Sequence, residues 1–171
     1  HERFAPKLIG TWKDAEYLRW RYVDHPRFNY VLRFAEANAG GDLNGLLVYR
    51  IETVRDRREK GMRVVEVLAA EGVGANLARS IVQSGEESGV AFADFYCTSS
   101  EIAKPLEAAG FVLEDSMPVP LPSLFQPLDA SVTRLTGAFW ISPELAQDSR
   151  AFFKDSMFYI TRSDCDQDRP N

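Results

Sequence analysis

The pattern of apolar and polar positions is clearest in residues 64–89, where a short apolar run leads through a turn into an amphipathic stretch. Residues 64–70 are rich in β-branched side chains and too few for a helix, so they predict a buried strand that only Glu66 interrupts. After the turn, apolar and small residues recur on one face of a predicted helix at Leu77, Ala78, Ile81, Val82 and Gly85. This helix should end near Gly89.

Upstream of this unit, the pattern predicts a helix and a hairpin. Residues 11–14 have the spacing of a capping box, with Asp14 in place of the usual Glu or Gln, and a helix should run from there to about Val23. Residues 30–36 and 46–54 are β-rich and flank a turn with several glycines, which predicts an antiparallel hairpin. The charged residues 55–60 should form a solvated loop, although contact with the phosphates of a cofactor is the alternative.

Downstream, residues 90–97 are apolar on both faces and predict a strand buried between layers. A helix capped by Ser99 or Ser100 should extend toward Ala109 with Pro105 inside it, followed by a strand over residues 111–114. The proline-rich residues 117–128 should be extended, with a polar helix at 143–153 and a last strand at 156–161. We expect one domain over residues 1–171, with a core at about 11–162 and a mixed, mainly antiparallel α/β sheet flanked by helices.

Composition narrows the class of protein. The chain has 171 residues, of which 45% are hydrophobic, so it can bury a core of ordinary size. Its net charge of −5 and the lack of a basic stripe argue against nucleic acid as a partner. No apolar run is long enough to span a membrane and no signal peptide is visible, while two cysteines are too few for a disulfide framework, so we expect a cytoplasmic location without a membrane partner. The chain starts at His1 without Met, which leaves open a segment or another domain upstream.

The turn between the predicted strand and helix is the candidate ligand site. A helix start leaves its first amides without partners and carries the positive end of the helix dipole. No side chain suited to capping lies there, so a bound oxyanion could satisfy the amides. The alternative is that the glycines only form a tight turn. The candidate residues are Gly72, Val73, Gly74, Ala75 and Asn76.

The run GVGANLARSIVQSGEESG resembles the acyl-coenzyme A loop and following helix of the GCN5-related N-acetyltransferases, whose signature is Q/R-x-x-G-x-G/A. Gly72 and Gly74 match its two small positions, but Ala69 stands where the family has Gln or Arg. The resemblance implies acetyl-CoA or another acyl-CoA as cofactor, and a strand amide near the turn, with Leu68 as the candidate, that polarises the thioester carbonyl. It also implies an acetyltransferase-like fold, here lacking the first strand and helix of that family.

Acyl transfer to an amine needs a base, donors for the developing oxyanion and an acid for the departing thiolate. The resemblance implies a Glu on the strand as the base, which is Glu66 here. Its pKa would be raised if it is buried, and the alternative is that it points into solvent. The family's later pattern places Leu106 where its acid, a Tyr, would stand. Tyr96 is the nearest substitute donor, with a buried structural tyrosine as the alternative.

Two functions remain open at this point. The first is an acyl-CoA-dependent N-acyltransferase that acts on a small-molecule or glycan amine, such as an amino sugar in polysaccharide biosynthesis. The second is a catalytically silent acetyltransferase-like domain that has a binding or structural role in a larger tandem protein. The sequence indicates neither the acceptor nor the oligomeric state. No metal site is expected, because the alternating Asp164, Asp166 and Asp168 lack the glycine and distal Glu of a calcium loop and predict a solvated tail.

Overall fold

The computed structural model describes residues 9–36, 43–54, 56–118, 124–125, 128–129, 140, 142–146 and 158–165. Its centre is a four-stranded sheet in the order β2-β3-β4-β5. The strands are β2 (Val31–Glu36), β3 (Leu43–Thr53), β4 (Lys60–Ala69) and β5 (Phe92–Phe95). The pairs β2–β3 and β3–β4 are antiparallel and β4–β5 is parallel, which confirms the predicted mixed, mainly antiparallel sheet.

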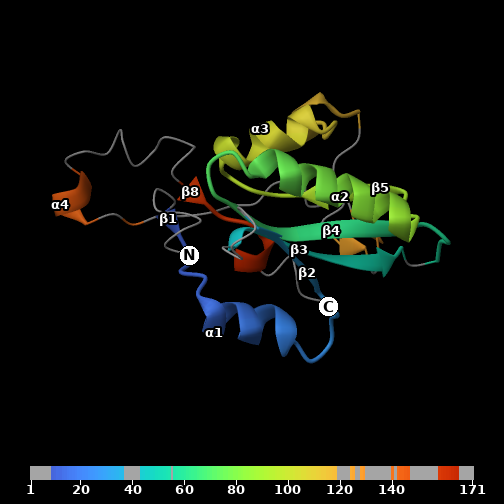
Figure 1. Cartoon of the computed structure of the whole chain (residues 1–171), viewed down its shortest axis with the longest axis horizontal. Coiled ribbons are helices and arrows are strands. Elements are labelled where there is room, and N and C mark those ends of the chain that lie inside the picture. Colours follow the sequence, from blue (N-terminus) through green and yellow to red (C-terminus); the bar gives the residue numbers. More distant parts are fainter. Residues whose placement is uncertain are drawn as a thin grey trace.

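Helices cover both faces of this sheet. In Figure 1, α2 (Gly74–Ser88) and α3 (Ser100–Ala108) lie above it, and α1 (Ala15–Leu18) lies below it. Because both faces are covered, β4 is buried at every position from Gly61 to Leu68. A strand buried on both faces reads as a near-continuous apolar run, which is why the sequence pattern located it.

The central helix is confirmed. The apolar positions Leu77, Ala78 and Ile81 are buried, and the helix ends at Gly89, whose φ of 62° is adopted most readily by a residue without a Cβ. Val82, also predicted on the apolar face, is 38% exposed. The buried face is therefore narrower than the pattern suggested.

The first helix begins later than the capping-box spacing indicates. Asp14 is the N-cap, since its carboxylate accepts a hydrogen bond from the Tyr17 amide at 2.8 Å. Residues 11–14 are not helical, and the Lys13 side chain among them is turned into the interior. The helix continues from α1 as the π-helical segment η1 (Arg19–Val23), so its predicted end at about Val23 is confirmed.

Two predicted strands differ from the structure. β5 is shorter than residues 90–97, lies at the end of the strand order, and is only half-buried apart from Asp94. The strand predicted at residues 111–114 is wrong. The amide of Phe111 donates to the carbonyl of Leu106 in the turn that ends α3, and η2 (Glu114–Ser116) is a single 3₁₀ turn. The exposed fractions of Val112 (63%) and Leu113 (52%) show that no sheet covers them.

The remaining elements are short. β1 (Ile9–Gly10) pairs in parallel with β8 (Phe158–Tyr159), and β6 (Leu124–Phe125) pairs with β7 (Leu128–Asp129). The helix α4 (Pro143–Ala146) confirms the start of the predicted polar helix, and η4 (Arg162–Asp164) follows β8. The rest of that helix, from 147 to 153, and the first two residues of the predicted last strand lie outside the described residues.

Ahead of β2, the described chain forms only the two-residue β1 and the α1–η1 segment, in line with the expected loss of the first strand and helix. None of the helices described has both the length and the apolar character required to cross a membrane.

Candidate functional site

The strands β4 and β5 separate before β4 ends. Their pairing stops at Val64 and Phe95, and from there to Ala69 the edge of β4 that faced β5 has no strand partner in the described chain. On its other side, β4 stays paired with β3, where the Ala70 amide donates to the Asn44 carbonyl at 2.9 Å. Backbone groups alternate in direction along a strand, so those of Leu68 face β3 and those of Val67 face the side that β5 has left. The amide on the open edge is therefore that of Val67, one residue before the predicted Leu68.

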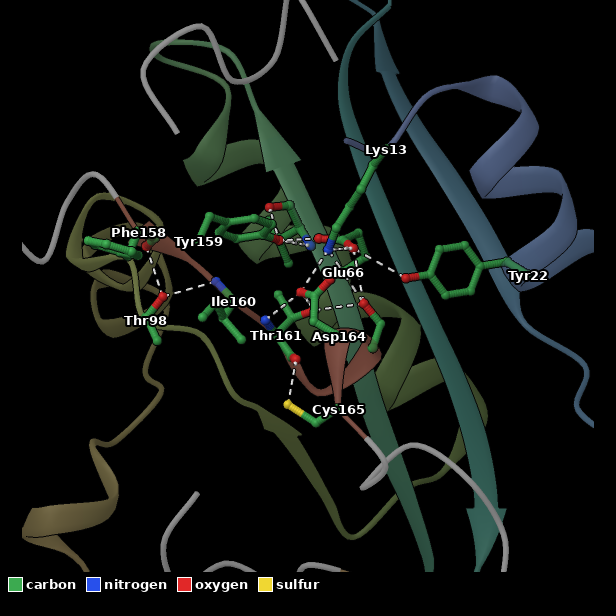
Figure 2. A network of polar contacts seen from close by, with 12 residues as sticks. Lys13, Tyr22, Glu66, Thr98, Phe158, Tyr159, Ile160, Thr161, Asp164 and Cys165 are labelled. Carbon is green, nitrogen blue, oxygen red and sulfur yellow. Dashed lines mark hydrogen bonds and ion pairs between the residues drawn. The ribbon is translucent and has the colours of Figure 1, made fainter. Parts of the chain in front are cut away.

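A segment from near the C-terminal end of the described chain fills the gap between the separated strands. The Thr98 hydroxyl donates to the Phe158 carbonyl at 2.8 Å and accepts from the Ile160 amide at 3.0 Å. On the opposite side of the segment, the Tyr159 hydroxyl accepts from the Val67 amide at 3.0 Å and lies 2.7 Å from the Val67 carbonyl oxygen. The open edge of β4 is thus capped by a side chain of the same protein (Figure 2).

Glu66 lies beside this contact and is completely buried, so the alternative that it points into solvent is wrong. Figure 2 shows side chains converging on its carboxylate from three parts of the chain. Its Oε2 lies 2.6 Å from Lys13 Nζ, 3.2 Å from the Tyr22 hydroxyl and 3.3 Å from the Ser163 hydroxyl. Its Oε1 accepts a hydrogen bond from Tyr159. A buried carboxylate is tolerated only with such partners, because burial removes it from water.

Lys13 is the cation of this network. Among the described residues, its Nζ contacts oxygens of Glu66, of Asp164 at 3.0 Å and of Ser163 at 3.5 Å. Burial alone would lower the pKa of Lys13, but the two carboxylates outweigh it and the pKa is raised. The side chain is therefore an ammonium ion at neutral pH.

Asp164 was expected in a solvated tail, and this prediction is wrong. Its side chain is 8% exposed and ion-paired with Lys13, and it also accepts from the Thr161 amide at 2.9 Å. Asp166 and Asp168 lie outside the described residues. Among the residues that the structure places, no group of carboxylates, histidines and cysteines could hold a metal ion.

The two tyrosines of the network remain protonated. Burial, and then the nearby Glu66 charge, raise the pKa of Tyr159 and of Tyr22 well above the ordinary value of 10.0. The Tyr159 hydroxyl has a single proton, and both the Glu66 carboxylate and the Val67 carbonyl lie within reach of it.

Tyr96, the predicted proton donor, is half-buried and follows β5 directly, at the point where β4 and β5 separate. Burial raises its pKa above 10.0. The tyrosines that hydrogen-bond to Glu66 are Tyr159 and Tyr22, and Tyr96 is not among them. The sequence pattern predicted a strand around Tyr159, but which side chain of that strand reaches Glu66 depends on long-range packing.

A second buried cluster lies next to the first. Asp94 Oδ2 lies 3.0 Å from Arg63 Nη2 and 3.0 Å from Arg162 Nη1, and all three side chains are buried. The short element η4 joins the clusters, because it supplies Arg162 to this one and Ser163 to the other. The two arginine partners explain why Asp94, an aspartate, is the one fully buried residue of β5.

At the glycine turn, the backbone conformation and the packing of the fold explain both glycines without a ligand. Gly72 has a φ of 81°, and a Cβ on Gly74 would come within 2.8 Å of Pro105 in α3. The turn is nevertheless open on its outer side, where Gly72, Ala75 and Asn76 are exposed. Within the described chain, backbone hydrogen bonds engage the amides of Val73 and Asn76 but not those of Gly74 and Ala75. Two donors at the start of α2 are therefore not engaged by backbone acceptors of the described chain, and no side chain caps them.

The mixed sheet, the glycine turn and the two covering helices have the arrangement that the resemblance implies, so the fold is similar to that of the GCN5-related N-acetyltransferases. No family model matches the chain, and no curated protein matches its sequence.

Several solved structures match the fold. One is wild-type TTHA1254 from Thermus thermophilus, with a TM-score of 0.49, 17% identity and coverage of 81% of this chain and 92% of that one. Another is glucosamine-6-phosphate N-acetyltransferase from Arabidopsis thaliana, with a TM-score of 0.46, 14% identity and coverage of 61% and 76%. A third, an aminoglycoside acetyltransferase from an uncultured soil metagenomic sample, has a TM-score of 0.43, 16% identity and coverage of 66% and 76%. At these values the likeness does not extend to activity or substrate.

Proposed function

We propose that this domain binds an acyl-coenzyme A and transfers its acyl group to an amine. The observation that carries the proposal is the separation of β4 from β5 just before the turn that starts α2. Two sets of backbone donors follow one another along this part of the chain: the Val67 amide on the strand edge, which donates to Tyr159 in the structure, and the Gly74 and Ala75 amides at the helix start. A thioester carbonyl and a pyrophosphate are the two parts of an acyl-CoA that such donors bind.

The residues around this path suit the chemistry. The amine nitrogen would form a bond to the carbonyl carbon as its proton passes to Glu66, and the C–S bond would break as the thiolate leaves and takes up a proton. The Val67 amide would donate to the developing oxyanion. We retain Tyr96 as the candidate acid, because it lies where the strands separate. Leu68 would contribute as part of the strand, since its backbone is paired with β3.

The cofactor site would comprise Gly72, Val73, Gly74, Ala75 and Asn76. Arg79, whose guanidinium donates to the Asn76 side chain, places a positive charge one turn from the free amides. An amino sugar of a polysaccharide pathway is the acceptor class that we favour, and a cytoplasmic location, where acyl-CoA is available, belongs to the same proposal.

Calorimetric titration with acetyl-CoA tests cofactor binding. Gly74 is a poor site for mutation, because any side chain there meets Pro105. Ala75 is exposed, and Ala75→Asp would place a carboxylate beside the free amides while favouring the helix start. We expect at least a tenfold loss of affinity in Ala75→Asp and little change in Ala75→Asn, whose side chain is neutral and of the same shape as that of Asp. Equal affinities in the two variants would show that the pyrophosphate does not lie there.

The role of Tyr96 is tested by Tyr96→Phe. If Tyr96 protonates the thiolate, turnover should fall while the affinity for acetyl-CoA stays nearly unchanged, because the lost interaction forms mainly in the transition state. Unchanged turnover in steady-state assays would remove Tyr96 from the mechanism.

The second candidate function is a silent acetyltransferase-like domain, and a specific observation favours it. The Val67 amide is occupied by Tyr159 and the Glu66 carboxylate by Lys13, so both groups are already engaged in structural contacts. Under this candidate, the protein shows neither acetyl-CoA binding nor transfer to any amine.

A further inference from the structure

Lys13 and Tyr159 meet on a single carboxylate. The Lys13 ammonium contacts Oε2 of Glu66, and the Tyr159 hydroxyl contacts Oε1 of the same group. Figure 2 shows the two side chains reaching Glu66 from different directions, Lys13 from the N-terminal part of the chain and Tyr159 from β8.

The ammonium of Lys13 and the hydroxyl of Tyr159 resemble the reacting groups of an acyl transfer. An acyl transfer to an amine brings together an ammonium group that gives a proton to a base and a carbonyl oxygen that accepts from a fixed donor. In the structure, a primary ammonium lies on the glutamate of β4, and a hydroxyl oxygen accepts from the Val67 amide, which points into the gap beside β4. Each group has the chemical character of the substrate atom that the site would bind.

We propose that Lys13 and Tyr159 are internal occupants of the acyl-transfer site, with the Lys13 ammonium in the place of the acceptor amine and the Tyr159 hydroxyl in the place of the thioester carbonyl oxygen. This inference rests on the proposed function. The domain without substrate is therefore in a closed state, and productive binding displaces both side chains.

The surroundings of Lys13 define the acceptor that fits. Oxygens of Glu66, Ser163 and Asp164 lie 2.6, 3.5 and 3.0 Å from Nζ, and two of the three come from carboxylates. An ammonium group can direct three donors to such a set, whereas a quaternary ammonium has no N–H to donate and a hydroxyl lacks the charge. The site thus favours a primary amine in its protonated form.

The two occupants lie on segments outside the four strands of the central sheet. Lys13 belongs to the irregular residues between β1 and α1, and Tyr159 belongs to the two-residue strand β8. β8 is held by its pairing with β1 and by the contacts of Thr98. The four strands of the main sheet do not depend on either segment for their pairing.

The first test uses Tyr159→Phe, which removes one oxygen atom and keeps the ring. With the hydroxyl gone, the Val67 amide is free for a thioester carbonyl, so affinity for acetyl-CoA should rise about tenfold. Coenzyme A itself has no carbonyl at that point, and its affinity should not change. Both are measured by calorimetry on the parent and the variant.

An equal change for the two ligands, or no change for either, would overturn the inference while leaving the proposed function intact. If neither ligand binds the parent or the variant, the proposed function fails and the inference fails with it. The two failures are therefore distinguishable.

The second test uses Lys13→Ala with propylamine added. The ammonium site is then empty, and the free amine should restore the melting temperature that the substitution lowers. With acetyl-CoA present, N-propylacetamide should form at least tenfold faster than with the parent, as measured by mass spectrometry. Trimethylpropylammonium, which has no N–H, is the control and should restore neither stability nor product.

Restored stability without product, in a variant that binds acetyl-CoA, would show that Lys13 is a structural cation only and would overturn the inference. If Lys13→Ala does not fold even with propylamine, the Tyr159→Phe comparison alone decides.

Discussion

The two faces of the central sheet are both buried, but by different kinds of interaction. On the face covered by α2 and α3, the helices contribute apolar side chains, namely Leu77, Ala78, Ile81, Ile102 and Leu106. On the face that α1 and η4 cover, ionic groups are buried instead, in the networks around Glu66 and Asp94. Apolar contacts are non-directional and tolerate small shifts, whereas each buried charge needs its partner in a defined position. One sheet therefore has a face buried by apolar contacts and a face on which charged groups are buried with their partners in fixed positions.

The largest effect is expected on the ionic face. Asp94→Ala leaves the Arg63 and Arg162 guanidiniums buried without the carboxylate that both contact, which should cost about 3–5 kcal/mol in the free energy of unfolding. Urea denaturation measures the loss, with the exposed Asp115→Ala as a control that should change stability by less than about 0.5 kcal/mol. Similar small changes in both variants would mean that the Asp94 cluster is open to water.

The apolar face should respond nearly as strongly to the loss of one side chain. Leu77 is 2% exposed, and Leu77→Ala should cost about 2–5 kcal/mol through lost burial and the remaining cavity. Val82→Ala on the same helix is the matched control, because Val82 is 38% exposed and should lose much less. If denaturation midpoints shift equally for the two variants, the helix face has been assigned incorrectly.

Alkaline pH should lower the stability of the protein, in part through the ionic face. The pKa values of Tyr22 and Tyr159 are raised above 10.0, and that of Lys13 is raised above 10.5. A group whose folded pKa exceeds its unfolded pKa contributes fully below the unfolded value and loses its contribution as pH rises through the folded value. Stability should therefore fall as pH rises, by up to about 1.4 kcal/mol per pH unit for each group, from about pH 9 for the Cys97 thiol, whose pKa burial raises from 9.0 to about 11, and above pH 10.0 for the tyrosines.

The measurement is a series of urea unfolding curves at increasing pH. Tyr159→Phe removes one of the groups whose pKa is raised, so its stability should decline less steeply with pH than that of the parent. Parallel declines in the two proteins would contradict the assignment of this pH dependence to Tyr159.

The smallest effect is expected for an ion pair on the surface. Glu101 and Lys104 lie 2.8 Å apart on α3, with side chains 62% and 67% exposed. Glu101→Gln should change the free energy of unfolding by less than about 0.5 kcal/mol, because solvent screens the pair. A loss comparable with that of Asp94→Ala would remove the distinction between buried and exposed ion pairs in this protein.

Much of the fold was predictable from local pattern. The β4–α2 unit, the β2–β3 hairpin and α3 can each be located by periodicity within a short window. The strand expected at residues 111–114 did not form, because local pattern is not sufficient there. A short β-rich segment forms a strand only where a sheet edge is available to it.

The candidate site was predictable only in part. Glu66 and the glycine turn could be located by their place in the pattern, while the ligand interpretation of the turn stays a prediction. Neither the burial of Glu66 nor the identity of its partners was visible, because Lys13 and Tyr159 are 53 and 93 residues away from it. A lysine before a helix and an aspartate in a polar stretch both predict solvated groups.

The sequence by itself determined the β2–β3 hairpin, the β4–α2 unit, α3 and the centre of the buried face of α2, because those properties depend on neighbours within a few residues. The tertiary structure decided that β4 extends beyond its pairing with β5, that the Val67 amide on the open edge donates to Tyr159, and that Lys13 reaches the Glu66 carboxylate. These contacts join the two ends of the described chain to its centre. Ion pairs and hydrogen bonds of that kind follow from the path of the whole backbone, and no local spacing of residues encodes them.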